Sequence, residues 1–571
     1  MLTRQERRFR RRRRSARPAP EALRPAESTP LLLQAAAFLA VFAAAILVNL
    51  KTLHYGFLTS WDDPTYVVDN PWIRGLSREN LIYVFTKPYF ANYLPLHLVS
   101  YMVDYTLWGL NPFGYHLQSV LLNGLNAILA LFVTRRLFAN FLLAFLAALL
   151  FAVHPSHVEA VAWISIRKDL LSTAFLLLTV LFYHRATGSR SLGRGAYAAS
   201  IGCFTLGLLS KVSIVALPLF LLVLDWFPRA GRRRIPWKAA IANKIPYALI
   251  GLVLVRINTL VQVKAKAAYA QDPIPYLMVK GHAVWNYLAL LTGIPSGRPV
   301  YDTPEFASGL ASVAANLAGI LVLPAVLWIA HRRRWDALGL GAGWVLALLL
   351  PAILFPLVTY MADRYLYGPS LGFCWLLAAG IVAVGRRMES IRLRAGVTAI
   401  LTALPLTLFA YRTIEYDRAW AGSEPLWKYA IARSKDYRVR NNLAQAMMIE
   451  KRWADAERLY RQASAVENIV SHQGLAAVYY DTHRYPEAQR EIERALEIAH
   501  KHGAAYTDLT DATMEDLAEI EYTAGAIYWV QSQNQKAIEA WEAALRANPR
   551  HAGAAQWLRT ARGEPAPVTT K

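Results

Sequence analysis

Two adjacent carboxylates, Asp62 and Asp63, follow a tryptophan shortly after the first apolar stretch of the chain. Such a pair on an exposed loop suits proton transfer, because one carboxylate can accept the proton of an attacking hydroxyl while its neighbour positions the substrate or a metal ion. The same residues, in the order Ser60-Trp61-Asp62-Asp63-Pro64, also suit a turn or a helix cap. The motif alone leaves a catalytic pair and a structural cap equally open.

A second group of titratable residues lies in the segment HPSHVEAVAWISIRKD. His154, His157 and Glu159 fall within six residues, and two imidazoles with a carboxylate can bind a divalent metal. Arg167 and Lys168 can instead hold a phosphate, the first through bidentate contacts and the second as a point charge. An interfacial turn whose basic side chains reach lipid head groups explains the same residues without any chemistry.

Asp169 ends that segment, and a third cluster, Asp363-Arg364-Tyr365, precedes another apolar stretch. Arg364 can contact an anionic group, although an aromatic belt with one arginine is the simpler interpretation of this cluster alone. Lys211 lies in a tight connection between two apolar stretches and can also reach a phosphate or a diphosphate. Three separate parts of the chain thus offer cations to an anionic substrate.

Membrane-spanning helices are the elements that must position these residues. The chain of 571 residues is 55% hydrophobic, with a mean hydropathy of +0.24, 29 Tyr and 17 Trp, which is typical of a polytopic membrane protein. Residues 31–50 carry no charge and are long enough to cross a bilayer. With ten later apolar stretches, the sequence predicts an all-α membrane domain over 31–411 with about eleven spans. A further stretch, 276–296, is assigned to the outer face.

Basic residues indicate which face is which, because they fall in short runs between the spans, as in cytoplasmic loops. The first run, RRFRRRRR, lies in the tail 1–30 and places the N-terminus in the cytoplasm. The outer face then collects four segments: the loop 51–113 with the acidic pair and interfacial helices, His154–Asp169, Lys264–Ser308 and Thr359–Tyr367. The net charge of +23 therefore indicates anionic membrane lipids as partners, and no nucleic acid.

The composition becomes polar and Ala-rich from about Arg418. Leu443-Ala444, Leu475-Ala476 and Ala524-Gly525 begin three matching patterns of small and large residues, typical of tetratricopeptide helix pairs. Neighbouring pairs of this kind bury one continuous core; an unrelated helical bundle is the alternative. The expected segments are a linker over 412–436, a repeat solenoid over 437–560 with an insertion around His502 to Asp516, and a flexible tail over 561–571.

The motifs WDDPTYVVDNPWI, HPSHVEAVAWISIRKDLLS and MADRYLYGPSLGFCWL occur in this order and precede the repeats. In this they resemble the transmembrane and tetratricopeptide-repeat-containing O-mannosyltransferases, which belong to the GT-C superfamily of membrane glycosyltransferases. The resemblance covers residues 31–560. It implies an inverting transferase that moves a sugar, mannose in that family, from a polyprenyl-phosphate carrier to Ser or Thr hydroxyls of a protein on the outer side. It also implies that Asp62 and Asp63 are the catalytic centre.

This hypothesis gives each candidate residue a role. Asp62 or Asp63 accepts the proton of the acceptor hydroxyl, and four cations stabilise the departing phosphate: Arg167, Lys168, Arg364 and Lys211. The supporting residues are Trp61, His154, His157, Glu159, Asp169, Asp363 and Tyr365. A phosphate leaving group is already activated, so no cofactor is required. His154, His157 and Glu159 then order their loop by hydrogen bonds, or bind a divalent metal if one takes part. The repeat domain holds the protein acceptor.

Two other functions fit the sequence. A lipid-linked glycan polymerase or ligase, or a lipid-modifying transferase, shares the donor site and differs in its acceptor. A non-catalytic membrane scaffold uses the repeats to recruit partners and tolerates neutral substitutions in the outer loops. The Arg- and Ala-rich composition and the presence of only three recognisable repeats favour a bacterial protein in the inner membrane, with the catalytic face and the repeats outside the cytoplasm.

Overall fold

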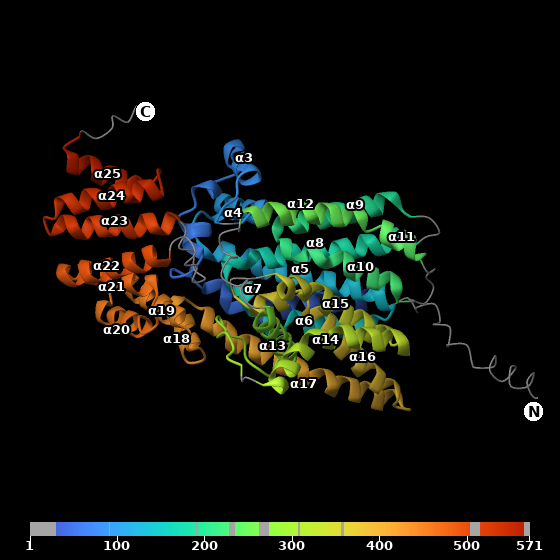
Figure 1. The fold of residues 1–571 in the computed structure, drawn as a ribbon. Helices are drawn as coiled ribbons and strands as arrows, with labels where there is room; N and C mark the ends of the chain where they lie inside the picture. The colour runs from blue at the N-terminus through green and yellow to red at the C-terminus, as the bar shows by residue number, and fades with distance from the viewer. Residues whose placement is uncertain are drawn as a thin grey trace, which may run out of the picture.

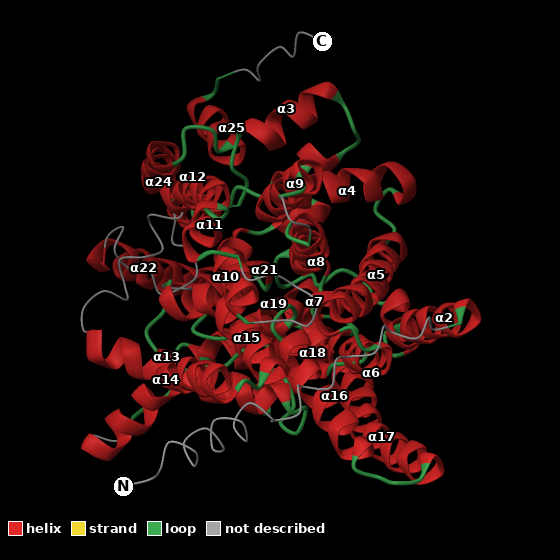
Figure 2. Cartoon of the chain, turned by 90° about the vertical axis from the view of Figure 1, so that its right-hand side faces the viewer, coloured by secondary structure: helices red, strands yellow, loops and turns green. Residues whose placement is uncertain are grey.

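The computed structural model describes residues 30–90, 92–188, 192–227, 235–261, 273–306, 309–355, 359–502 and 514–564. Every regular element within these ranges is a helix, and they contain no strand (Figure 2). The prediction of an all-α chain is therefore confirmed. Four predicted features lie wholly or partly outside the described residues: the basic tail up to residue 29, the start of the outer region at Lys264, most of the insertion around His502 to Asp516, and the tail from residue 565.

The helices form a large bundle and a smaller C-terminal stack at one end of it (Figure 1). The helices of the bundle are α2 (Leu31–Leu47), α3 (Arg78–Thr86), α4 (Pro95–Trp108), α5 (Pro112–Phe138), α6 (Phe141–Ala152), α7 (Val158–Ala162), α8 (Arg167–Ala186), α9 (Arg194–Ser210), α10 (Leu217–Trp226), α11 (Trp237–Ala242), α12 (Ile245–Val261), α13 (Pro273–Leu291), α14 (Leu310–Arg333), α15 (Asp336–Leu354), α16 (Ser370–Arg386) and α17 (Ile391–Asp417).

Five helical stretches of the described chain are long and apolar enough to cross a membrane: Pro112–Phe138, Trp237–Leu260, Leu310–Arg333, Asp336–Leu354 and Ile391–Trp420. A sixth results if the bent pair Phe141–Ala152 and Pro155–Ala162 is one span. Shorter apolar helices, such as Leu31–Leu47 and Ser370–Arg386, pack beside them. These helices indicate an integral membrane protein. The count of eleven spans remains a prediction.

Helix α5 illustrates how the local sequence sets these elements. The side chain of Asn111 accepts a hydrogen bond from the Phe113 N–H, and Pro112 occupies the first helical position, where a missing N–H costs nothing. The helix ends at Phe138, the capping residue Ala139 has a left-handed φ of 51°, and Arg135 and Arg136 lie in the last turn. A polar side chain thus begins this mostly apolar helix, and two basic side chains lie at its other end.

Buried polar contacts join the helices near the site. The Asn126 amide of α5 donates to the Leu170 carbonyl of α8 at 2.9 Å and to the Tyr367 hydroxyl at 3.1 Å. Tyr367 in turn donates to Asn123 at 2.9 Å. Because an unpaired polar group in this interior is costly, these bonds fix α5, α8 and the turn before α16 in one arrangement. Figure 2 shows α6 beside α16 and α17, which complete this side of the bundle.

The C-terminal stack consists of consecutive helices: α18 (Ser423–Ile431), α19 (Tyr437–Ile449), α20 (Trp453–Ala463), α21 (Ile469–Asp481), α22 (Tyr485–His502), α23 (Met514–Val530), α24 (Asn534–Ala547) and α25 (Ala552–Arg562). They pack in the successive pairs α19–α20, α21–α22 and α23–α24. Small residues lie against aromatic rings: a Cβ at Gly474 would lie 2.4 Å from the Tyr460 ring, and one at Gly525 would lie 2.3 Å from Trp541. The first contact joins α20 to α21 of the next pair, and the second joins α23 to α24 within one pair. Small-against-aromatic packing, which the sequence pattern predicts, therefore acts both within and between the pairs.

Residues 412–436 differ from the linker that the sequence predicts. Helix α17 continues to Asp417, a 3-10 turn follows at Arg418–Trp420, and α18 occupies Ser423–Ile431. Leu426 and Trp427 of α18 are fully buried. The bundle and the C-terminal stack are therefore joined by packed helix.

Candidate active site

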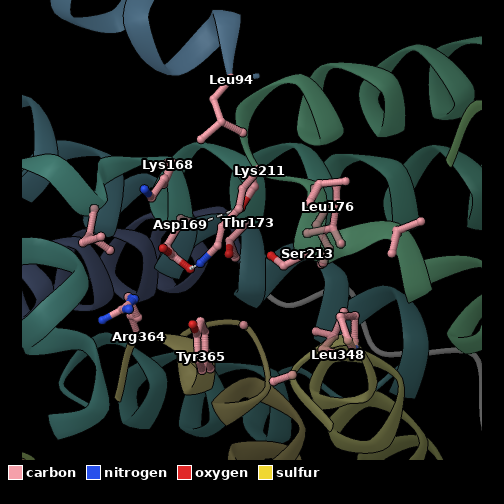
Figure 3. A pocket seen from close by; sticks show the side chains of 18 of the residues that line it. Leu94, Lys168, Asp169, Thr173, Leu176, Lys211, Ser213, Leu348, Arg364 and Tyr365 are labelled. Atoms are coloured by element: carbon pink, nitrogen blue, oxygen red, sulfur yellow. Dashed lines mark hydrogen bonds and ion pairs between the residues drawn. The ribbon is translucent and has the colours of Figure 1, made fainter. Parts of the chain in front are cut away.

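One cavity of about 290 Å³ brings together residues from three of the four segments that the sequence assigns to the outer face; none of the described residues of Lys264–Ser308 is part of its lining. Its walls come from the start of α8, the turn η6 (Val212–Ala216), α12, the end of α15 and the turn η8 (Asp363–Leu366). The charged residues that line it are Asp62, Lys168, Asp169, Lys211 and Arg364. Figure 3 shows Lys168, Asp169 and Lys211 on one side and Arg364 with Tyr365 across from them.

The rest of the lining combines an apolar wall with polar side chains, which are those of Asn92, Ser172, Thr173, Ser213, Asn258 and Thr259. Leu176 from α8, Ile214 from η6, Val255 from α12, and Leu348 and Phe355 at the end of α15 form this wall. The cavity is therefore amphipathic, with charged groups at one part and a hydrocarbon surface at the other. A ligand with an anionic head and an apolar tail matches such a lining.

The two carboxylates of the first outer loop lie in different environments. Asp62 lines the cavity, whereas Asp63 is only 1% exposed. One oxygen of Asp63 accepts the Leu58 N–H at 2.9 Å, and the other accepts the N–H of Ser165 at 3.1 Å and its hydroxyl. Asp63 therefore joins the first outer loop to the segment that leads into α8, and Asp62 is the carboxylate that a ligand in the cavity can reach.

Burial gives Asp63 a testable signature, because it raises the pKa of this carboxyl from the ordinary 3.8 to about 6. The folded protein then takes up a proton at a higher pH than the unfolded chain does. This one carboxyl should therefore add about 3 kcal/mol to the free energy of unfolding as the pH falls from about 6 to about 4. Thermal unfolding at pH 4 to 7 measures this gain, and Asp63→Asn should remove it. If Asp63→Asn shows the same pH dependence of unfolding as Asp62→Asn and the wild type, Asp63 is not the carboxyl whose pKa is raised by burial.

Neighbouring side chains orient two of the three cations that line the cavity, Lys211 and Arg364. The Lys211 Nζ lies 2.5 Å from an Asp169 oxygen and 5.3 Å from the centre of the Tyr365 ring. The Arg364 guanidinium forms an ion pair with the fully buried Glu159, which also accepts the Arg364 N–H at 2.8 Å. Since each contact leaves N–H donors over, both cations can also bind an anion.

Lys168 differs from these two cations. Its Nζ lies 5.1 Å from the centre of the Tyr66 ring, in a cation–π contact. It lines the cavity beside Asp62. The ring contact does not neutralise its charge, so Lys168 offers an ammonium group to the charged part of the cavity.

Arg167 does not line the cavity, which corrects its expected place beside Lys168 in the phosphate site. Its fully buried guanidinium forms an ion pair with Asp104 of α4 and donates to the Gln118 side chain at 2.6 Å and the Tyr115 carbonyl at 2.8 Å. Consecutive residues of a helix point about 100° apart, so adjacent cations at the start of α8 face different surroundings. Arg167 ties α8 to α4 and α5.

A structural role for Arg167 predicts a specific pattern of stability. Arg167→Met leaves Asp104 buried without its partner and should lower the free energy of unfolding by about 3–5 kcal/mol. Adding Asp104→Leu removes the unpaired charge and should restore most of that loss. Thermal unfolding of the two variants measures this difference. If the double variant is no more stable than Arg167→Met, the ion pair is not what the single change disrupts.

The three residues considered as metal ligands point to separate partners. The His154 Nε2 lies 3.0 Å from the Leu291 carbonyl, and the His157 Nε2 lies 2.9 Å from the Ser370 hydroxyl. Glu159 pairs with Arg364. Within the described ranges, no group of three His, Cys, Asp or Glu side chains could hold a metal ion. The contacts of these residues order the segment before α8 instead.

Asp363 lies just behind Arg364 and outside the cavity lining. It is buried, and it accepts the Arg298 N–H at 3.0 Å and the Tyr301 hydroxyl. Burial, together with the Glu159 charge, raises the pKa of Asp363. Gly297 allows the close approach, because a Cβ there would lie 2.2 Å from an Asp363 oxygen. Asp363 therefore anchors the segment that follows α13.

Trp61, beside the acidic pair, belongs to an aromatic cluster. Its ring centre lies 3.9 Å from that of Trp163, 4.7 Å from that of Trp427 and 6.1 Å from that of Trp420. Trp420 and Trp427 come from the junction with the C-terminal stack. The sequence contains no motif that marks these two residues, or the apolar wall from α12 and α15, as parts of the site.

Comparison with known proteins supports one of the readings of the sequence. The chain matches no family model. It is 25% identical to human protein O-mannosyl-transferase TMTC1 over 505 residues, which cover 75% of this chain and 56% of the relative. It is also 25% identical to Tmtc3 of Drosophila melanogaster over 545 residues, 80% of this chain and 58% of the relative. The chain spans about half the length of the curated relatives that it matches.

These matches confirm the resemblance to protein O-mannosyltransferases that the ordered motifs indicate. The names of the relatives also agree with the prediction of an enzyme. Among solved structures, ArnT from Cupriavidus metallidurans bound to undecaprenyl phosphate matches with a TM-score of 0.38 and 16% identity. That match covers 73% of this chain and 81% of ArnT.

Proposed function

We propose that the chain is a membrane glycosyltransferase that moves a sugar, mannose, from a polyprenyl phosphate to Ser or Thr hydroxyls of a protein outside the cytoplasm. The observation that carries this proposal is the cavity in which Asp62 and three cations lie at one part and an apolar wall at the other. Relatives named as protein O-mannosyl-transferases support the choice of sugar and acceptor.

In the proposed reaction, Asp62 is the general base. It accepts the proton of the acceptor hydroxyl as the hydroxyl oxygen attacks the anomeric carbon. The bond from that carbon to the phosphate oxygen breaks, and the new glycosidic bond forms on the opposite face of the sugar, so the configuration inverts. Asp63 keeps the loop in place through Leu58 and Ser165, as its three hydrogen bonds require.

Lys168, Lys211 and Arg364 would stabilise the leaving group. Breaking the sugar–phosphate bond adds negative charge to the phosphate, and cations already fixed in a site of low polarity stabilise that charge without reorganising. Asp169, Glu159 and the ring of Tyr365 hold two of these cations in place. The apolar wall would contact the first prenyl units of the carrier.

The distribution of charge along the helices supports the proposed orientation. Helix α5 begins near the site, where the Tyr115 carbonyl contacts Arg167, and carries Arg135 and Arg136 at its other end. Helix α16 likewise begins at Ser370 beside His157 and ends at Arg386. Basic residues thus gather at the ends away from the cavity, as they do on the cytoplasmic side of membrane proteins.

The C-terminal helix pairs would be the acceptor domain. We regard them as tetratricopeptide repeats because consecutive helices pack in pairs, with small residues against aromatic rings within and between the pairs. They lie at the end of the bundle that holds the first outer loop, since α18 contacts Ser60 directly. A protein bound there is close to the cavity.

Mass spectrometry of exported glycoproteins tests this function. Cells with the intact gene should carry O-linked hexose on Ser or Thr residues that is missing from cells without the gene. A matched strain carrying Asp62→Asn should show the same loss. Unchanged O-linked hexoses with altered surface polysaccharide would contradict a protein acceptor and support a glycan acceptor, and unchanged hexoses and polysaccharide would contradict the transferase itself.

A further inference from the structure

The first helix of the C-terminal stack, α18, is bonded directly to the loop that carries Asp62. The Trp427 Nε1–H donates to the Ser60 hydroxyl at 2.8 Å. The Ser423 hydroxyl accepts the Ser60 N–H at 3.3 Å and lies 3.2 Å from the Thr59 hydroxyl. These contacts reach the two residues that lie two and three positions before Asp62.

The aromatic cluster makes the same connection through packing. Trp61 has Trp163 of the bundle and Trp427 of α18 as neighbours, with ring centres 3.9 Å and 4.7 Å away. Trp427 is fully buried, and Trp163 is 2% exposed. The indole next to Asp62 is thus held between the two parts of the molecule, and aromatic pairs of this kind have specific geometry.

A second connection lies earlier in the loop. Asp417, the last residue of α17, accepts hydrogen bonds from the Thr52 hydroxyl at 2.7 Å and the Tyr55 hydroxyl at 2.9 Å. Asp417 is buried, so removing either donor leaves a lone pair without a partner in an apolar surrounding. The first outer loop is therefore anchored at two places, by Asp417 at the end of α17 and by Ser423 and Trp427 of α18.

The other side of the cavity is also attached to the C-terminal stack. The backbone N–H of Arg298 donates to Asp363, next to Arg364, while its guanidinium donates to the Arg433 carbonyl at 3.2 Å. The Tyr429 hydroxyl of α18 donates to the Gly297 carbonyl at 3.2 Å. One short region of the stack thus contacts both the segment that holds the proposed base and the segment that supports a proposed phosphate ligand.

We propose that α18 is a positioning element for Asp62, with Trp427 as its principal positioning residue. The inference rests on the proposed function and deepens it, because the part that begins the acceptor domain would also fix the geometry of the base. A displacement of about 1 Å in a reacting group costs about a hundredfold in rate. Loss of the Trp427–Ser60 bond frees the residues next to Asp62 and leaves the cavity cations where they are.

The Trp427→Phe variant tests this role, because it keeps an aromatic ring and removes the Nε1–H. We expect kcat for sugar transfer to fall about tenfold to a hundredfold, with the KM for the polyprenyl-phosphate sugar unchanged. Trp375→Phe in α16 is the matched control: Trp375 is also fully buried and also donates its Nε1–H to a hydroxyl, that of Thr134 at 2.7 Å. This control should keep the wild-type kcat.

Ser60→Ala provides a second variant that removes the same bond from the other side. If the bond acts as proposed, the double variant Trp427→Phe with Ser60→Ala should be no slower than the slower single variant. If the wild type transfers sugar and Trp427→Phe, Ser60→Ala and Trp375→Phe all keep its kcat, the positioning role is overturned and the proposed function stays intact. A wild-type protein without transfer activity would instead overturn the proposed function, and the positioning role with it.

Discussion

Replacing Asp62 with asparagine should lower kcat for sugar transfer by roughly 10²–10⁴-fold, the range that a positioned general base contributes. Asparagine has nearly the same shape but cannot accept a proton at neutral pH, so the change removes the base and keeps the lining of the cavity. Asp62 lies on the cavity surface, so the fold should tolerate the substitution. Initial rates with saturating donor and a Ser- or Thr-containing peptide measure the effect.

The neighbouring carboxylate supplies the contrast. Asp63→Asn places an amide where Leu58 and Ser165 now donate, so this variant should show altered thermal unfolding together with lower activity. Asp62→Asn should keep the wild-type unfolding temperature. Wild-type activity in Asp62→Asn would contradict the assignment of the base, whatever the effect of Asp63→Asn.

Replacing Lys168 with methionine is expected to have the second-largest effect. It removes a cation that faces the charged part of the cavity and keeps the apolar stem, so the leaving phosphate loses electrostatic stabilisation. A single group of this kind contributes about 10²–10³-fold to kcat. Stopped-time assays with the labelled lipid donor check the rate, and donor binding measured separately shows whether affinity falls as well.

The adjacent arginine gives the control for that experiment. The double variant Arg167→Met with Asp104→Leu removes a cation one residue away in α8 but leaves the cavity lining unchanged. Its kcat should stay close to that of the wild type. If both proteins lose activity equally, the loss reflects the start of α8 as a whole and not a phosphate contact of Lys168.

The pattern of spans and outer loops predicts which segments meet at the site, because helices of a bundle bring their outward ends to one face. Asp62, Lys168, Lys211 and Arg364 line one cavity although they lie far apart in the chain. The pattern does not predict which of two adjacent residues faces the cavity. Asp62 and Asp63, and Arg167 and Lys168, differ only in the direction of their side chains, which tertiary packing decides.

Other residues of the site cannot be identified from a single sequence. Val255 and Leu348 line the cavity, but an apolar residue in a spanning helix has the same type whether it faces a ligand, a neighbour or lipid. Trp427 follows a composition change that indicates a linker, although it is buried against the first outer loop. Its role depends on a contact across more than 360 residues of chain.

Transfer of labelled sugar by the purified protein in lipid vesicles tests the central claim most directly. The vesicles contain polyprenyl-phosphate mannose with a labelled sugar, and the acceptor is a peptide with Ser and Thr residues. The account predicts that the wild type moves the label to a peptide hydroxyl with inversion at the anomeric carbon, and that Asp62→Asn does not. Label that stays on the lipid with the wild type, or equal transfer by Asp62→Asn, would contradict it.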